Sequence, residues 1–206
     1  MGRRRTPQMT LQGWLDLARS ADVRGRIAAE VGLDDFQAIV RVVARRDVLD
    51  WDEAVAILHK VYGWMPTMLR PTAVHTEMER TRLLTSLETA KRGELLNSEQ
   101  LAWVQRFANR SIVGASKLLH VLNPANYAIW DSRVAEVFLW SGVTQATYST
   151  LERYVEYLAA LRQWVNVSDV TRQCAEIRSL NTALADAGDL RLIELVLFRG
   201  KESKAP

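Results

Sequence analysis

The chain reads Asn109-Arg-Ser-Ile-Val-Gly-Ala-Ser-Lys-Leu-Leu-His120 and, after Val-Leu-Asn-Pro-Ala-Asn, continues Tyr127-Ala-Ile-Trp-Asp-Ser-Arg-Val134. This pattern predicts a bend near Asn109, a helix that stops at Asn123-Pro124 and a further helix that begins at Asp131, because proline cannot continue a helix and Asp is a preferred N-cap. Backbone amides at a glycine-bearing helix start, here near Gly114, can bind phosphate. Lys117 in that helix and Asp131 after the connection could then face one cleft.

Apolar residues recur at helical spacing along nearly the whole chain, and no segment shows the alternation typical of a β-strand. Thr10, Asp50 and Ser98 are predicted to begin helices as N-caps. A long helix is expected over 147–165, and the segment 63–71, with its two prolines, is expected to be an ordered loop. These signals together predict an irregular, all-α, multi-helix fold of about ten helices.

Length and composition are those of an ordinary domain, with 206 residues of which 48% are hydrophobic. We expect a basic flexible tail at 1–9 and a single all-helical domain at 10–206, which could form two helical lobes around a cleft. No apolar run is long enough to cross a membrane, and no apolar signal-peptide core follows the basic start. Cys174 is the only cysteine, so no intrachain disulfide or multi-cysteine zinc site is expected. These features predict a cytoplasmic protein.

The charge balance permits nucleic-acid binding without requiring it, with a formal net charge of +3 and a pI of about 9.2. Arg3, Arg4 and Arg5 could contact phosphates, or could simply keep a flexible end solvated. The seven tryptophans are expected partly in the core and partly available for stacking on bases. The three histidines lack metal-ligand spacing, and neither a metal nor a cofactor is expected.

The stretch 109–134 resembles the helix-hairpin-helix DNA glycosylase superfamily, which includes endonuclease III, adenine glycosylase and 8-oxoguanine DNA glycosylase. In that family a hairpin of the type Leu-Pro-Gly-Val-Gly holds a DNA phosphate, the following helix can carry a lysine nucleophile, and an aspartate begins the next helix. Ile112-Val-Gly114, Lys117 and Asp131 stand at the corresponding positions here. Ser111 and Ile112 replace the hairpin's proline and first glycine, and Lys117 follows Gly114 by three positions instead of two. The iron–sulfur cysteines are absent, so the chain looks like a small, atypical member.

The resemblance implies catalytic roles for Asp131 and Lys117. A carboxylate near C1′ would stabilise the positive charge that develops on the sugar when an N-glycosidic bond breaks. Lys117 could attack C1′ and form a Schiff base, or could bind phosphate in an enzyme that uses water. The structural alternatives are an N-cap for Asp131 and a solvated side chain for Lys117. Helical spacing places Gly114, Lys117 and His120 on one face, which is expected to be the less apolar one.

Base excision also requires a pocket for the extruded nucleotide. Trp130, Tyr127 and His120 are expected to line it, with Trp64 and Met65 as a second wall or as a wedge. Core packing is the alternative for each of these side chains. DNA is expected to be held by the hairpin and its flanks, namely Ile112, Val113, Gly114, Ala115, Ser116, Asn109, Arg110 and Arg133.

The predicted function is a DNA glycosylase that removes a modified or damaged base, either in repair or in defence against modified foreign DNA. Two alternatives stay open: a non-catalytic DNA-binding protein that keeps the hairpin, and a helical protein-interaction module in which Lys117 and Asp131 lie on the surface. The sequence identifies neither the base nor the choice between monofunctional and strand-nicking chemistry. DNA is the expected partner, a membrane is not, and a monomer is the expected state. The apolar segment Leu190–Phe198 is expected to close the core or to form a dimer contact.

Overall fold

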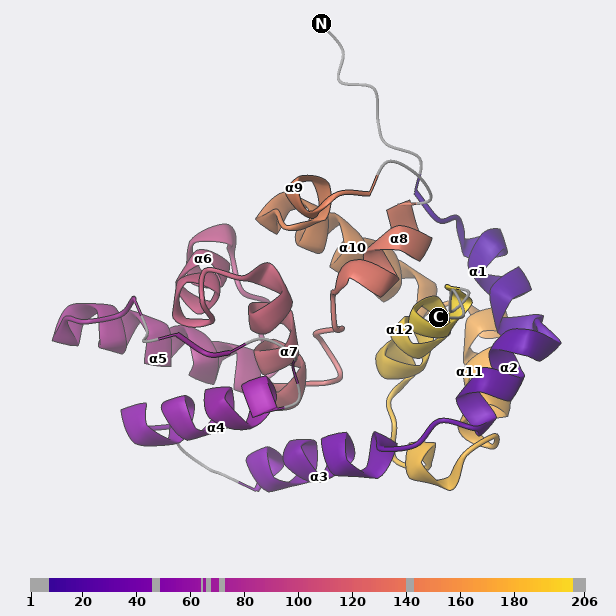
Figure 1. The fold of residues 1–206 in the computed structure, drawn as a ribbon, viewed down its shortest axis with the longest axis horizontal. Helices are drawn as coiled ribbons and strands as arrows, with labels where there is room; N and C mark the ends of the chain where they lie inside the picture. The colour runs from indigo at the N-terminus through magenta and orange to yellow at the C-terminus, as the bar shows by residue number, and fades with distance from the viewer. Residues whose placement is uncertain are drawn as a thin grey trace, which may run out of the picture. The chain divides into compact units, whose positions relative to one another are not determined.

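The computed structural model describes residues 8–45, 49–63, 65, 68–70, 73–139 and 143–201. These residues form helices and irregular connections without a strand (Figure 1), which confirms the all-α class. None of the described helices has the length and apolar character needed to cross a lipid bilayer. The helices are α1 (Leu11–Arg19), α2 (Ala21–Ala28), α3 (Leu33–Ala44), α4 (Trp51–Gly63), α5 (Glu77–Lys91), α6 (Ser98–Phe107), α7 (Ile112–Leu122), α8 (Ser132–Leu139), α9 (Gln145–Tyr148), α10 (Leu151–Trp164), α11 (Ser168–Arg178), the 3-10 helix η1 (Thr182–Leu184) and α12 (Asp189–Gly200).

Two predicted N-caps are confirmed by hydrogen bonds to the first turn of their helices. Thr10 Oγ1 accepts from the backbone N–H of Gly13 at 3.1 Å, and Asp50 Oδ1 accepts from that of Glu53 at 2.8 Å. Such bonds satisfy N–H groups that have no partner within the helix. The starts of α1 and α4 therefore follow from local side-chain chemistry.

Two other predicted boundaries are wrong. Asn97, not Ser98, caps α6, because Asn97 and Gln100 form a reciprocal capping box in which each side chain accepts from the other's backbone N–H, at 2.9 and 3.0 Å. The long helix expected over 147–165 is divided into α9 and α10. Thr150 separates them as the N-cap of α10.

The chain divides into two compact units. Unit 1 comprises residues 1–31 and 130–206, and unit 2 comprises residues 32–129. Of the features expected from the sequence, the arginines of the N-terminal tail and Trp64 lie outside the described residues.

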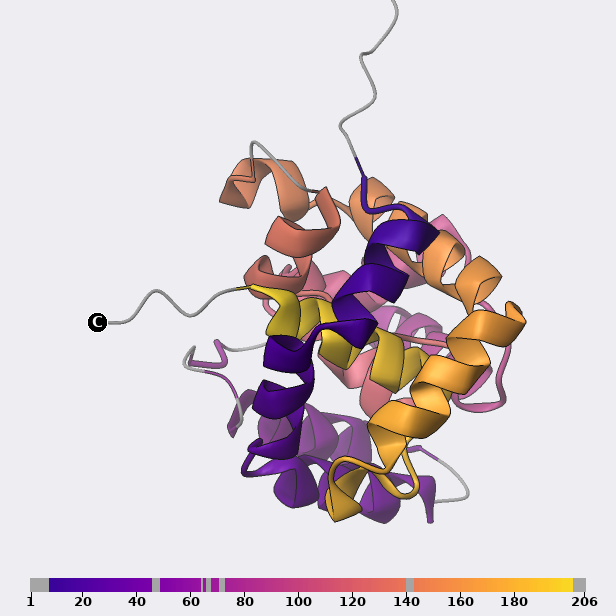
Figure 2. The ribbon, with the colours of Figure 1, turned by 90° about the vertical axis from the view of Figure 1, so that its right-hand side faces the viewer.

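Unit 1 is organised around α12, which packs against α1, α2, α8, α10 and α11. Figure 2 shows α12 in yellow, with the indigo α1 and α2 and the orange α11 around it. Its residues from Leu190 to Leu197 are all buried, so the apolar C-terminal segment closes the core of this unit, as expected. Trp14 of α1 donates its indole N–H to the carbonyl of Ile193 at 3.1 Å, which fixes α1 on α12.

Unit 2 is organised around α7, which packs against α3, α4, α5 and α6. Nine of the eleven residues of α7 are buried, and only Val113 and Lys117 are partly exposed. These two residues are four positions apart and therefore share one face of the helix. The central helix of unit 2 is thus the helix that follows the predicted hairpin.

Candidate functional site

The connection between α6 and α7 is a tight turn with two consecutive left-handed residues. Asn109 and Arg110 have φ angles of 56° and 55°, a region that L-residues other than Asn and Asp rarely adopt. Ser111 then caps α7, with its Oγ accepting from the backbone N–H of Gly114 at 3.2 Å. The predicted bend and the predicted helix to Leu122 are both present.

Three backbone N–H groups of this turn, those of Arg110, Ile112 and Val113, have no acceptor among the described residues. The N–H groups of Ile112 and Val113 belong to the first turn of α7, where the helix dipole also favours an anion. The exposed side chain of Arg110 adds a positive charge beside them. The backbone of the turn is therefore suited to hold a phosphate.

Gly114 has a packing role that the sequence motif did not reveal. A methyl group at this position would meet the Tyr62 hydroxyl and would lie 3.1 Å from Tyr62 Cζ and 3.2 Å from Ala108 Cβ. Tyr62 also donates its hydroxyl to the carbonyl of Ala108 at 3.1 Å, which fixes α4 against the end of α6. Glycine is therefore required here for the close approach of α7 to α4, whether or not a phosphate binds nearby.

Three of the side chains predicted to hold DNA are buried in unit 2. Ile112, Ala115 and Ser116 are at most 1% exposed, so these residues could meet DNA only through their backbone. Asn109 holds a neighbouring loop instead: its Nδ2 donates to the carbonyl of Met68 at 3.0 Å and its Oδ1 accepts from the N–H of Arg70 at 2.9 Å. Contacts of these residues with DNA stay predictions.

His120 and Tyr127 are buried in the core of unit 2. His120 Nδ1 lies 2.6 Å from the carbonyl oxygen of Tyr127, and its ring stacks on Phe36 with centroids 5.6 Å apart. Tyr127 donates its hydroxyl to the carbonyl of Glu94 and accepts from the N–H of Leu96, both at 3.0 Å. His120 thus joins the connection after α7 to α3, and Tyr127 joins it to the segment between α5 and α6, so both residues have a structural role.

The face of α7 that was expected to be the less apolar one is not a solvated face. Gly114 packs on Tyr62 and His120 has no exposed surface. Lys117 is partly exposed beside Val113 instead.

Asp131 lies at the N-terminus of α8 in unit 1. Its Oδ1 accepts from the backbone N–H of Val134 at 3.0 Å, so the predicted N-cap is confirmed, and the residue is partly exposed. Trp130 precedes it with no exposed surface, and the indole N–H of Trp130 donates to the carbonyl of Tyr148 at 2.9 Å. The Trp130 ring also contacts Tyr157, with centroids 4.7 Å apart. Trp130 is therefore an anchor in the core that fixes the backbone at Asp131.

Sequence reasoning missed two buried charges in the same unit, Arg191 and Glu194 of α12, which form an ion pair. Burial lowers the pKa of Arg191 to about 10, while the negative charges of Tyr157, when ionised, and of Asp131 act in the opposite direction. Burial is also the main reason why the pKa of Tyr157 is raised, with a smaller contribution from Asp131. The charge of Asp131 thus acts on two groups of the core. An Arg and a Glu three positions apart inside an apolar segment were the available signal.

Two further residues predicted for the site, Arg133 and Met65, are at least partly exposed. Arg133 is exposed, and its guanidinium lies 5.0 Å from the centre of the Phe198 ring. Met65 is partly exposed, and its N–H donates to the carbonyl of Tyr62 at 3.0 Å, which closes a turn after α4. Among the described residues, no three His, Cys, Asp or Glu side chains are grouped so that they could hold a metal ion.

The predicted catalytic pair is divided between the two units, since Lys117 belongs to unit 2 and Asp131 to unit 1. Neither unit alone contains both groups. No protein-family model, curated protein or solved structure matches the chain. The resemblance to the glycosylases therefore depends on the residues of the 109–134 stretch.

Proposed function

We propose that the protein is a DNA glycosylase that removes a modified or damaged base. The observation that carries the proposal is the setting of Asp131, a partly exposed carboxylate at a helix start, fixed by the buried Trp130 beside it. One carboxylate oxygen is used as the cap, and the other has no partner among the described residues. Its negative charge would stabilise the oxocarbenium-like sugar as the glycosidic bond breaks.

The turn between α6 and α7 supports binding of the DNA backbone in this proposal. The N–H groups of Arg110, Ile112 and Val113 would donate to one phosphate, and the Arg110 side chain would add charge attraction. Such contacts position a strand but do not read its sequence. The base specificity would therefore come from elsewhere in the protein.

Lys117 is the proposed nucleophile. Its neutral amine would attack C1′ of the sugar, and the base would leave with the electron pair of the glycosidic bond and take a proton from solvent. Loss of a proton from the nitrogen and opening of the sugar would then give a Schiff base, which borohydride reduces to a stable protein–DNA link. In a monofunctional enzyme a water molecule would attack instead, and Lys117 would contact phosphate.

Base release from duplexes that contain oxidised, deaminated, alkylated or hypermodified bases tests the proposal, with Asp131→Asn as the decisive variant. Asn caps helices as well as Asp does, so this change removes the charge and keeps the fold. We expect release to fall at least about 10²-fold. Asp169→Asn, at an exposed ion pair with Arg172 in the same unit, is the control and should keep full activity. Undiminished release by Asp131→Asn would refute the role of its charge.

Borohydride trapping tests the role of Lys117 separately. Wild-type protein should form a covalent complex with a cleaved substrate, and Lys117→Gln should not. Lys60→Gln, an exposed lysine of α4, should trap normally. Base release without trapping in the wild-type protein would indicate a water-using enzyme and would rule out the lysine as nucleophile.

A DNA-binding protein without base excision is the second candidate. Two observations favour it: Asp131 has a structural role as the cap of α8, and the backbone N–H groups of Arg110, Ile112 and Val113 suit a phosphate without any catalytic group. Salt-sensitive DNA binding with no release from any tested base would favour this candidate. Absence of DNA binding would leave a protein-interaction module.

A further inference from the structure

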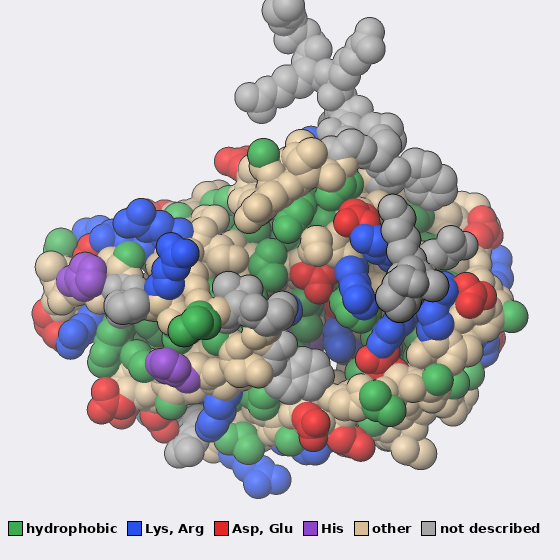
Figure 3. Space-filling model, viewed as in Figure 1, with side chains coloured by type: hydrophobic (Ala, Val, Ile, Leu, Met, Phe, Trp, Pro, Cys, Tyr) green, Lys and Arg blue, Asp and Glu red, His purple; other side chains and the backbone are tan. Residues whose placement is uncertain are grey.

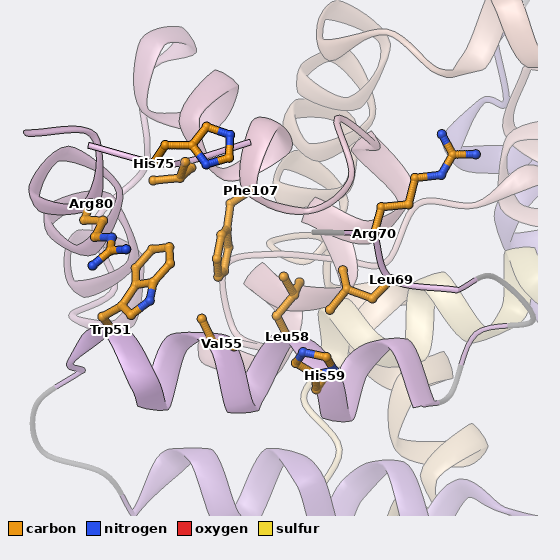
Figure 4. A pocket seen from close by; sticks show the side chains of 10 residues that line it. Trp51, Val55, Leu58, His59, Leu69, Arg70, His75, Arg80 and Phe107 are labelled. Carbon is orange, nitrogen blue, oxygen red and sulfur yellow. The ribbon is translucent and has the colours of Figure 1, made fainter. Parts of the chain in front are cut away.

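Unit 2 contains a pocket of about 580 Å³, and none of its lining residues is among those proposed for catalysis or DNA binding (Figure 4). Its walls come from α4, α5, the end of α6 and the described parts of 69–75. The volume lies within the range of about 300–1,000 Å³ that is common for small-molecule sites. The lining residues are Trp51, Val55, Leu58, His59, Leu69, Arg70, Val74, His75, Arg80 and Phe107.

Two aromatic side chains, Trp51 and Phe107, are among the lining residues. Trp51 and Phe107 have ring centroids 5.6 Å apart and planes inclined by 55°. In Figure 4 both rings stand above α4, with Val55 below and between them. Trp51 is partly exposed, whereas Phe107 is buried at the base of the site. A planar ring placed against Trp51 would gain stacking and apolar contact.

The ionisable side chains that line the pocket are all basic. The ten lining residues include Arg70, Arg80, His59 and His75 and no carboxylate. Figure 3 shows Lys and Arg side chains beside the histidines on the face where α4, α5 and α6 lie. The acidic Glu79 is engaged elsewhere, since it accepts from backbone N–H groups and pairs with Arg106 at 2.8 Å. A bound anion would therefore meet no negatively charged side chain among the lining residues.

Among these basic side chains, Arg80 gives the strongest indication of an anionic ligand. Its guanidinium lies 4.6 Å from the centre of the Trp51 ring. No described carboxylate pairs with it, and its buried Nε has no hydrogen-bond acceptor among the described residues. A buried donor without an acceptor is unfavourable, and a ligand oxygen would remove this penalty. The aromatic surface and the unsatisfied donor lie in the same site.

We propose that this pocket binds a nucleoside monophosphate unit, with its base against Trp51 and its phosphate at Arg80. A planar ring accounts for the aromatic walls, and a phosphate accounts for the group of basic side chains. The unit has two sources with the same chemistry: a free nucleotide, or an unstacked nucleotide of single-stranded DNA. The inference does not depend on catalysis by Asp131.

Isothermal titration calorimetry on the full chain tests the proposal with 2′-deoxyadenosine 5′-monophosphate, deoxyadenosine and a single-stranded DNA octamer as probes. We expect the nucleotide to bind at least about tenfold more tightly than the nucleoside, since only the nucleotide reaches Arg80 with a phosphate. Binding of both nucleotide and octamer would support a site for free nucleotides. Binding of the octamer alone, if Arg80→Gln weakens it, would support a site for a DNA strand.

Two variants and a matched control connect the binding to the pocket. Arg80→Gln removes the charge, and Val55→Phe adds bulk to the pocket wall at a partly exposed position. Each should weaken binding of the tighter probe at least about tenfold. Arg82→Gln is the control, because Arg82 is also on α5 and also lies over a tryptophan, Trp103, but does not line the pocket.

The results can contradict the proposal in two ways. Unchanged affinity in both Arg80→Gln and Val55→Phe would show that binding occurs elsewhere, and no binding of any probe would overturn the proposal outright. Circular dichroism of each variant verifies folding, and Val55→Phe tests the pocket if Arg80→Gln does not fold. The Asp131→Asn protein should bind the probes normally. A loss of base release with intact probe binding would therefore separate failure of the glycosylase proposal from failure of this one.

Discussion

A methyl group at Gly114 has no room, because Tyr62 and Ala108 occupy the space that it would need. We expect Gly114→Ala to lower the free energy of unfolding by about 1–3 kcal/mol, the usual effect of overpacking a buried site. Urea denaturation measures it. Tyr62→Phe removes the hydroxyl that the methyl would meet, so the double variant should lose less than the sum of the two single variants. Additive losses would show that Tyr62 does not set the requirement for glycine.

The structural role of Asp131 can be measured separately from its proposed catalytic role. Asp131→Ala removes the bond to the N–H of Val134 and should lower the free energy of unfolding by about 1 kcal/mol, whereas Asp131→Asn keeps a capping oxygen and should lose less. Thermal or urea denaturation of the two variants makes the comparison. Equal losses in both would mean that the charge, not the capping bond, stabilises the start of α8.

At the scale of one helix, the first turn of α5 should make the free energy of unfolding depend on pH in the acidic range. Hydrogen bonds from the backbone N–H groups of Thr76 and His75, followed by the charge of Arg106, lower the pKa of Glu79 from 4.5 to about 2. A carboxylate with a lowered pKa stabilises the fold above its ordinary pKa, and this contribution is lost as the pH falls through that range.

We therefore expect Glu79→Gln to be less stable than the wild type at neutral pH and the difference to shrink as the pH falls from 4.5 to about 2. Urea denaturation at a series of pH values measures the difference. Glu77→Gln, an exposed position on the same turn of α5, is the matched control. A difference that does not change with pH would contradict the assignment.

The ion pair in α12 should behave unlike the exposed pairs of the same unit. Glu194→Ala leaves the buried Arg191 without this carboxylate, and we expect a loss of about 3–5 kcal/mol in the free energy of unfolding. The Arg191→Met, Glu194→Leu double variant should recover most of this loss. The exposed pair Asp169–Arg172 has the same spacing, and its disruption should change stability by less than about 1 kcal/mol. Similar losses at both pairs would show that burial does not decide the effect.

The all-helical fold could be predicted because helix formation and capping depend on residues close in the sequence. Thr10 and Asp50 are examples, since each caps its helix through a residue three positions later. The cap of α6 was misassigned because Asn97 and Ser98 are both good caps. Gln100 decides between them, as it stands three positions after Asn97 and completes the capping box.

The candidate site could be predicted only in part, because burial depends on residues far apart in the sequence. His120 stacks on Phe36 and Gly114 packs on Tyr62, and the spacing within α7 reveals neither contact. The aromatic pocket of unit 2 was also missed, since Trp51 and Phe107 belong to different helices. Local patterns place residues on helices, but they do not say which helices meet.

At the scale of the whole molecule, Cys174 provides a probe of unfolding. It has no exposed surface, and burial raises the pKa of its thiol to about 12. Because the thiolate is the reactive form, we expect almost no reaction with a disulfide reagent at pH 8 in the native state. Full reaction should appear in denaturant, followed by absorbance of the released thiol. Rapid labelling of the native protein would mean that unit 1 opens frequently.

Unit 1 is assembled from both ends of the chain, whereas unit 2 is one uninterrupted segment. The ribosome makes α1 and α2 well before α11 and α12, against which they pack. Trp14 and Ile27, which have no exposed surface in the finished protein, must wait for these partners while the intervening chain is translated. At about 5–20 residues per second this delay lasts roughly ten seconds or more. The nascent chain therefore carries an uncovered apolar helix pair until the last helices of unit 1 have been made.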